Sequence, residues 1–216
     1  MLRWVYLWMA LGLFVTAGVA YMTVNTPALL SLLTGPAVLI AFVVELILVF
    51  SLAAALPRLS PGVAAVMFFA YSALNGFVLA SIFLIYEIGT ITAAFGATAA
   101  LFGAMTIVGF TTKLDLTRMR TFLMMGLIGL VIAMVVNMFI ASSGLDLIIS
   151  IVGVLIFTAL TAYDTQKLQR IAANPTIQSD GSLAMKLSIL GALTLYLDFI
   201  NLFLFLLRIL GGGRRS

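Results

Sequence analysis

Residues 153–166 read GVLIFTALTAYDTQ, and residues 195–208 read LYLDFINLFLFLLR. Each stretch is almost wholly apolar, yet each contains one aspartate, Asp164 in the first and Asp198 in the second. A carboxylate in the hydrocarbon of a membrane costs several kcal/mol, so such a residue usually faces a bundle interior or a water-filled path. The two stretches therefore predict membrane-crossing helices whose acidic faces point into the protein.

The composition of the whole chain agrees with this interpretation. Of the 216 residues, 64% are hydrophobic and only 8% are charged, whereas soluble domains carry about 25% charged residues. The apolar runs are long and have a helical period, without the short alternating strands of a membrane β-barrel. We therefore expect an all-α polytopic membrane protein that forms a single integral membrane domain over residues 1–216.

Seven apolar runs are long enough to cross a hydrocarbon core of about 30 Å. They cover residues 4–24, 37–56, 63–86, 90–111, 121–141, 147–163 and 183–207. The sixth run could continue as an amphipathic helix past Lys167 and Arg170, and the dipeptides at 174–175 and 180–181 mark a turn before the seventh.

The basic residues predict the orientation of the chain, because lysine and arginine gather in cytoplasmic loops. One side of the predicted membrane holds Arg3, Arg58, Lys113, Arg118, Arg120, Lys167, Arg170 and Lys186. The N-terminus is therefore expected to be cytoplasmic. Arg208, Arg214 and Arg215 then fall on the opposite side, so either the tail is an exception or the seventh run does not cross fully. We expect seven full crossings because the last run is long enough.

Polar and small residues form one stripe on each of the last two helices, at helical spacing. The seventh run carries Gly191, Thr194, Asp198, Asn201, Phe205 and Arg208, and the sixth carries Ser150, Gly153, Phe157, Thr161 and Asp164. We expect the two stripes to face each other or a shared cavity. The aspartates lie almost equally far from the turn at 180–181, so an antiparallel pair would bring them level near the cytoplasmic end.

Two carboxyl groups that meet share a proton more readily than they both ionise. Asp164 and Asp198 would then form a pH-sensitive lock: protonated, they tie the two helices together, and ionised, they repel and offer hard oxygen ligands to a cation. Asn201 lies on the same face as Asp198. Glu45 in the second run adds a third oxygen site, and Arg58 could pair with Asp164 as a latch.

A structural role is the alternative for each of these residues. Asp198 could hold helices in register by bonding to Asn201 or a facing threonine, and Asp164 could be a helix-end carboxylate paired with Lys167 or Arg58. Glu45 could serve interhelical hydrogen bonding alone. Arg58 could be no more than a marker of the cytoplasmic side.

Several motifs resemble the transmembrane Bax inhibitor motif family, in its bacterial form. They are TAYDTQ (161–166), LYLDFINLFLFLLR (195–208), YSALNG (71–76), FG (95–96) and TTKLDL (111–116). The resemblance covers about residues 60 to 208, and the motif at 195–208 is the most specific of them.

The resemblance implies seven helices with the C-terminal helix central in the bundle, and a pH-sensitive calcium leak through the bacterial inner membrane. Asp164 and Asp198 match its sensor pair and would hold Ca²⁺ transiently, as the transported ion and not as a resident cofactor. Glu45 matches the glutamate of the second helix, and Arg58 resembles a basic residue after it. Another branch of the family is thought to modulate a membrane AAA protease.

The sequence disfavours other classes of function. Histidine and cysteine are absent, so thiol chemistry and the usual transition-metal ligands are missing, and we expect no enzyme. An intramembrane aspartyl protease would also place two aspartates on neighbouring helices, but Leu195-Tyr-Leu precedes Asp198 where that class has Gly-x-Gly. No nucleic-acid partner is expected, because the basic residues are scattered. The expected partners are membrane lipids, Ca²⁺ and protons, with a membrane protease as partner in the regulatory alternative.

Overall fold

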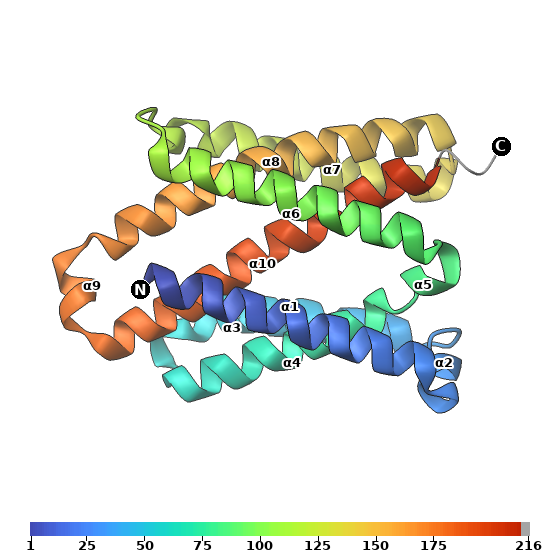
Figure 1. The fold of residues 1–216 in the computed structure, drawn as a ribbon, viewed down its shortest axis with the longest axis horizontal. Coiled ribbons are helices and arrows are strands. Elements are labelled where there is room, and N and C mark those ends of the chain that lie inside the picture. Colours follow the sequence, from blue (N-terminus) through green and yellow to red (C-terminus); the bar gives the residue numbers. More distant parts are fainter. Residues whose placement is uncertain (213–216) are drawn as a thin grey trace. The chain divides into compact units, whose positions relative to one another are not determined.

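The computed structural model describes residues 1–212, and within this range the chain is built from helices (Figure 1). The tail residues Arg214 and Arg215 lie outside the described residues. The α-helices are α1 (Leu2–Asn25), α2 (Pro27–Leu32), α3 (Ala37–Ala55), α4 (Pro61–Leu79), α5 (Ile82–Ile85), α6 (Ile88–Thr111), α7 (Arg120–Ile140), α8 (Ser143–Ala172), α9 (Pro175–Ser179) and α10 (Gly181–Gly212). Two short 3₁₀ turns, η1 (Leu56–Arg58) and η2 (Leu116–Met119), precede α4 and α7.

Seven helical segments of the described chain are long and apolar enough to cross a membrane. They are Leu2–Asn25, Ala37–Arg58, Pro61–Ile85, Ile88–Thr111, Leu116–Ile140, Ser143–Ala172 and Gly181–Gly212. The predictions of an all-α membrane fold and of seven spans are confirmed, and most predicted ends agree within a few residues.

The sixth span is the main difference in length. The predicted span ended at residue 163, and the continuation of its helix past Lys167 and Arg170 is confirmed, because α8 runs without a break to Ala172. Hydropathy identifies the residues of a helix that lie in the hydrocarbon, but the helix itself can continue beyond the membrane. The helix ends only where Asn174 precedes Pro175, because a residue before proline is biased away from helical geometry. Asp164 therefore lies inside a helix, more than two turns before its end.

The chain divides into two compact units that share α10. The first comprises residues 1–86 and 171–196, and the second comprises residues 87–170 with the remainder of α10 from Leu197. In the most apolar 18-residue stretch of α10, 67% is buried, whereas the corresponding stretches of the other six spans are 11–44% buried. α10 is therefore the most buried of the seven described spans, and its central place in the bundle stays a prediction. The single-domain organisation over residues 1–216 stays a prediction.

Close helix packing in the first unit depends on glycine. A Cβ atom added at Gly76 of α4 would lie 2.5 Å from the Thr16 carbonyl oxygen of α1, and one at Gly12 would lie 2.5 Å from the Phe68 ring. Small residues of this kind let helix backbones approach in a membrane. The hydroxyl of Thr16 also donates to the Ser72 carbonyl at 2.9 Å, so a polar bond reinforces the packing.

The turn between α8 and α10 uses the expected capping residues. The Asn174 side chain accepts from the Thr176 backbone N–H at 3.0 Å, with Pro175 at the first position of α9. The Asp180 side chain accepts from the Leu183 N–H at 2.9 Å and so caps the start of α10. Side-chain oxygens at these positions satisfy the free N–H groups of a first helical turn, and α10 starts where the sequence predicted a turn.

Candidate acidic site on helices α8 and α10

Helix α8 and the C-terminal half of α10 pack along their predicted stripes within the second unit. The carboxyl groups of Asp164 and Asp198 interact electrostatically with each other. Two turns further along, the rings of Phe157 and Phe205 stack with centroids 5.9 Å apart. The residue numbers fall along α8 as they rise along α10, so the two segments are antiparallel, as predicted.

Gly153 brings the two helices together at the Phe205 ring. A Cβ atom at Gly153 would lie 2.6–2.7 Å from three atoms of that ring, including Cγ at its base. The glycine therefore leaves room for an aromatic side chain where any other residue would collide. This packing fixes the spacing of the helices that carry Asp164 and Asp198.

Asp164 is buried on α8 and pairs with a lysine of the same helix. The Lys167 Nζ lies 3.8 Å from the Asp164 Oδ1, one helical turn later, and 6.0 Å from the centroid of the Tyr163 ring. The lysine side chain is 51% exposed and the aspartate side chain only 10%, so the pair links a buried carboxyl group to the surface. Of the two partners that the sequence offered, the structure brings Lys167 to Asp164.

Arg58 lies in η1 and is exposed. It belongs to the first unit and Asp164 to the second. Its role as a latch stays a prediction.

Asp198 is the more enclosed of the two aspartates, with 4% of its surface exposed. Its Oδ2 has no hydrogen-bond partner among the described residues. Asn201, one turn later, donates from Nδ2 to the Leu197 carbonyl at 2.8 Å and so bonds within its own helix. Buried polar atoms are nearly always satisfied, so the free oxygen of Asp198 has capacity for a proton, a water molecule or a cation.

Two carboxylates form this site, and no larger acidic cluster surrounds it. Across residues 1–212, no group of three or more histidine, cysteine, aspartate or glutamate side chains is arranged to hold a metal ion. Calcium takes six to eight oxygen ligands in proteins. Any cation at this pair would therefore keep part of its water shell.

A network that the sequence did not predict ties the loop before α7 to α8, next to the aspartate pair. Gln166 donates from Nε2 to the Leu114 carbonyl at 2.8 Å and accepts from the Leu116 N–H at 3.0 Å. Arg170 lies one turn further on and binds Asp115 at 2.7 Å. Only the i, i+4 spacing of Gln166 and Arg170 was visible in the sequence, because their partners are about 50 residues away.

Asp115 lies outside the spans and is held in its ionised form. Hydrogen bonds from the Thr117 hydroxyl and from Arg170 lower the pKa of its carboxyl group to about 2. The charge of the Asp115–Arg170 ion pair is therefore constant near neutral pH.

A third buried acid, Glu45, lies in the first unit, among hydrogen-bonded polar side chains. Its carboxyl group hydrogen-bonds to the side chain of Asn75, and its Oε1 has no partner among the described residues. The Tyr196 hydroxyl donates to the Asn75 Oδ1 at 3.1 Å and lies 2.6 Å from the Thr16 hydroxyl oxygen. These hydrogen-bonded side chains connect four helices, α1, α3, α4 and α10. The role of Glu45 as a third oxygen site stays a prediction, because it and the aspartates belong to different units.

Comparisons with known proteins place the chain in a family. The model of the family described as "Inhibitor of apoptosis-promoting Bax1" matches residues 1–215. The chain belongs to the Bax inhibitor-1 family. It is 47% identical over 212 residues to the inner membrane protein YbhL of Escherichia coli K12, covering 97% of this chain and 90% of that protein.

Other proteins match this chain over nearly the same length. A protein of Deinococcus radiodurans is 44% identical over 209 residues, covering 97% of this chain and 88% of the relative. A protein of Borreliella burgdorferi is 42% identical over 210 residues, covering 96% and 90%. The resemblance inferred from the motifs is confirmed, and the chain is an integral membrane protein of this family.

Proposed function

We propose that this Bax inhibitor-1 family protein is a pH-sensitive leak channel for calcium in a bacterial inner membrane, gated by Asp164 and Asp198. The observation that carries the proposal is the unpartnered Oδ2 of Asp198, buried within electrostatic range of Asp164 on the neighbouring helix. Intramembrane carboxyl groups of this kind typically mark ion or proton pathways. In this role Asp164 and Asp198 bind protons and ions and transform no substrate, so we infer that the protein is not an enzyme.

The gate acts through the contact between α8 and α10. At low pH one proton lies between the two carboxyl groups, and the shared hydrogen bond ties the helices together. At higher pH both groups ionise, repel each other and become oxygen ligands for a passing cation. Lys167, whose ammonium group also interacts with Asp198, offsets part of the repulsion and sits at the exposed edge of the site.

A site with only two carboxylate ligands is better suited to conducting Ca²⁺ than to holding it permanently. Two carboxylates replace only part of the hydration shell of Ca²⁺, so the ion would bind weakly and leave readily. Conduction requires binding that is strong enough for entry and weak enough for exit. The cytoplasmic N-terminus is also part of the proposal, and it puts the aspartate pair near the cytoplasmic end of α8.

The regulatory alternative, modulation of a membrane protease without transport, has one observation in its favour. The loop at residues 113–120 exposes Leu114 and basic side chains, and Gln166 and Arg170 bind it to α8. An exposed loop next to the gate is a surface that a partner protein can recognise.

Calcium uptake into proteoliposomes at pH 8 tests transport itself. We expect uptake well above that of empty vesicles, and its loss in the Asp164→Asn/Asp198→Asn double variant. Asp115→Asn is the matched control, because it also neutralises a carboxylate of the second unit but leaves the pair intact. Uptake no greater than in empty vesicles would reject the leak and favour the regulatory alternative.

A further inference from the structure

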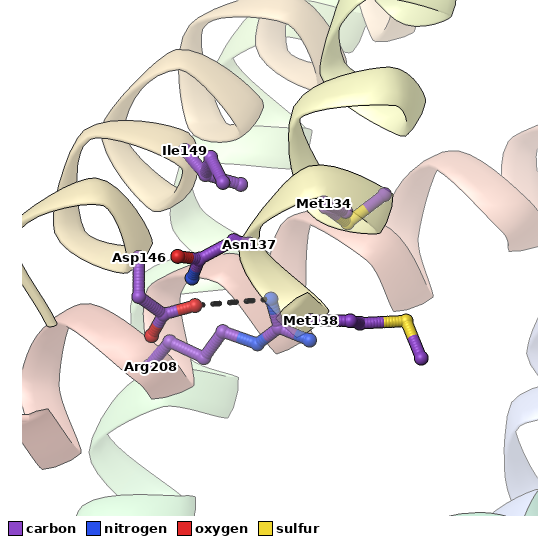
Figure 2. A pocket seen from close by; sticks show the side chains of 6 residues that line it. All are labelled: Met134, Asn137, Met138, Asp146, Ile149 and Arg208. Atoms are coloured by element: carbon purple, nitrogen blue, oxygen red, sulfur yellow. Dashed lines mark ion pairs between the residues drawn. The ribbon is translucent and has the colours of Figure 1, made fainter. Parts of the chain in front are cut away.

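A cavity of about 300 Å³ lies in the second unit, at the end of the α8–α10 pair that is remote from the aspartates. It is formed where α7 ends, α8 begins and α10 approaches its C-terminus (Figure 2). Its lining residues are Met134, Asn137, Met138, Asp146, Ile149 and Arg208. Because all three helices are membrane spans that end here, the cavity lies at the level of lipid headgroups.

The polar side of the cavity holds one acid and one base that are only loosely paired. The Asp146 Oδ1 and the Arg208 Nη1 are 3.8 Å apart, which is beyond hydrogen-bond distance, and both side chains are partly exposed. Arg208 also lies over the Phe205 ring, 5.6 Å from its centroid. Figure 2 shows the guanidinium and the carboxylate side by side in the cavity. Both groups retain capacity for further hydrogen bonds.

Asn137 adds a neutral donor beside this pair. Its Oδ1 accepts from the Ser142 N–H at 3.1 Å, which identifies Nδ2 as the atom left to donate. Figure 2 shows that nitrogen on the side of Asp146 and Arg208. The cavity thus presents two kinds of N–H donor, with a carboxylate beside them.

The remaining wall is apolar and continuous with the surface that meets lipid. Met134, Met138 and Ile149 line the cavity, and Met138 is 79% exposed. The adjoining Phe139 is 84% exposed. Exposed apolar side chains on membrane spans contact acyl chains, so a lipid can reach this cavity from the bilayer.

We propose that the cavity binds the headgroup of a phospholipid that carries both a phosphodiester and a primary ammonium group, as phosphatidylethanolamine does. The phosphate accepts hydrogen bonds from Arg208 and Asn137, and the ammonium donates to Asp146. The acyl chains run toward the bilayer centre along the exposed apolar side chains of α7, such as Val131 and Val135. Arginine suits phosphate because its planar fork can donate two parallel bonds.

Charge complementarity favours a zwitterionic headgroup over an anion or a metal cation. A phosphate ion or an anionic lipid would place its negative charge beside Asp146, and a metal cation would place its charge beside Arg208. A zwitterionic headgroup opposes a charge to each. Phosphatidylcholine carries the same charges, but its quaternary ammonium has no N–H to donate to the carboxylate.

Native mass spectrometry of the purified protein tests the proposal, with dioleoyl phosphatidylethanolamine, phosphatidylcholine and phosphatidylglycerol added singly, and inorganic phosphate in a separate titration. We expect phosphatidylethanolamine to bind at least about fivefold more tightly than phosphatidylcholine, the scale of one hydrogen bond of about 1 kcal/mol. Asp146→Asn should remove that preference. Arg208→Gln should weaken both lipids, and Arg208→Lys should restore part of the loss.

The control is Asp115→Asn, which breaks the ion pair at the other end of α8 and should leave the preference unchanged. Equal binding of the two zwitterionic lipids by the parent would overturn the proposal, as would an unchanged preference in Asp146→Asn. Tighter binding of phosphatidylglycerol, or displacement of bound lipid by inorganic phosphate, would show a plain anion site and would also overturn it. Melting curves of each variant identify any loss of binding that comes from unfolding.

Discussion

Replacing Gly153 by alanine tests whether α8 and α10 pack as closely as the structure places them. The new methyl carbon would lie 2.6–2.7 Å from three atoms of the Phe205 ring, whereas carbon atoms in contact are about 3.5–4.0 Å apart. The ring has little freedom to move away, because it is 4% exposed and stacks on Phe157 at 5.9 Å. Either the helices must separate or the Phe205 side chain must leave its rotamer.

The cost can be worked out from two opposing effects. Overpacking a well-packed core costs roughly 1–3 kcal/mol, while alanine favours a helix over glycine by about 1 kcal/mol. Gly129→Ala in α7 is the matched control, because nothing lies within 4 Å of a Cβ atom at that glycine. The control gains helix propensity without a collision, so the difference between the two variants isolates the packing cost, expected to be about 1–3 kcal/mol.

The free energy of unfolding can be measured by titrating the protein with SDS in mixed micelles and following helix content by circular dichroism. Gly153→Ala should unfold at lower SDS than Gly129→Ala. Adding Phe205→Leu to Gly153→Ala should recover part of the loss, because the smaller side chain makes room for the methyl group. If the two alanine variants have equal stability, α8 and α10 do not pack at Gly153 and the reasoning is wrong.

Two further predictions concern polar contacts. Tyr196→Phe removes the hydroxyl that donates to the Asn75 Oδ1 at 3.1 Å and lies 2.6 Å from the Thr16 hydroxyl oxygen. It should lower the free energy of unfolding by about 1–3 kcal/mol, the cost of leaving the buried Asn75 oxygen without its donor; Tyr21→Phe, at an exposed position, should change it little in the same SDS titration. Because hydrogen bonds lower the pKa of Asp115 to about 2 from 3.8, its stabilising contact with Arg170 is complete above pH 3.8 and is lost as the pH falls through 2. Melting temperatures of the parent and Asp115→Asn should therefore differ by a constant amount from pH 5 to 8, and should converge only toward pH 2.

The sequence predicted what depends on periodicity along one helix. The spacing of Gly153, Phe157 and Asp164 on α8, and of Asp198 and Phe205 on α10, identified the faces that the structure brings together. The length of the apolar runs was sufficient to predict the seven spans. Helix faces and apolar runs depend on residues close together in the chain, so they can be predicted from a single sequence.

Contacts between distant segments were not predictable in the same way. Gln166 binds backbone groups about 50 residues earlier, and the Tyr196 hydroxyl meets Thr16, 180 residues away. Nothing in the spacing of either residue specifies such a partner. The sequence suggested Lys167 or Arg58 as the partner of Asp164. In the structure Asp164 pairs with Lys167, which lies one turn away on the same helix.

The central claim is that Asp164 and Asp198 gate calcium flux by sharing a proton, and the most direct test is the pH dependence of the flux. Calcium uptake into proteoliposomes would be measured from pH 5 to 8 for the parent, Asp164→Asn, Asp198→Asn and the control Asp115→Asn. We predict uptake that rises with pH in the parent and in the control, and uptake that does not vary with pH in either variant of the pair. A parent flux that varies with pH and keeps the same midpoint in Asp164→Asn and Asp198→Asn would contradict the claim.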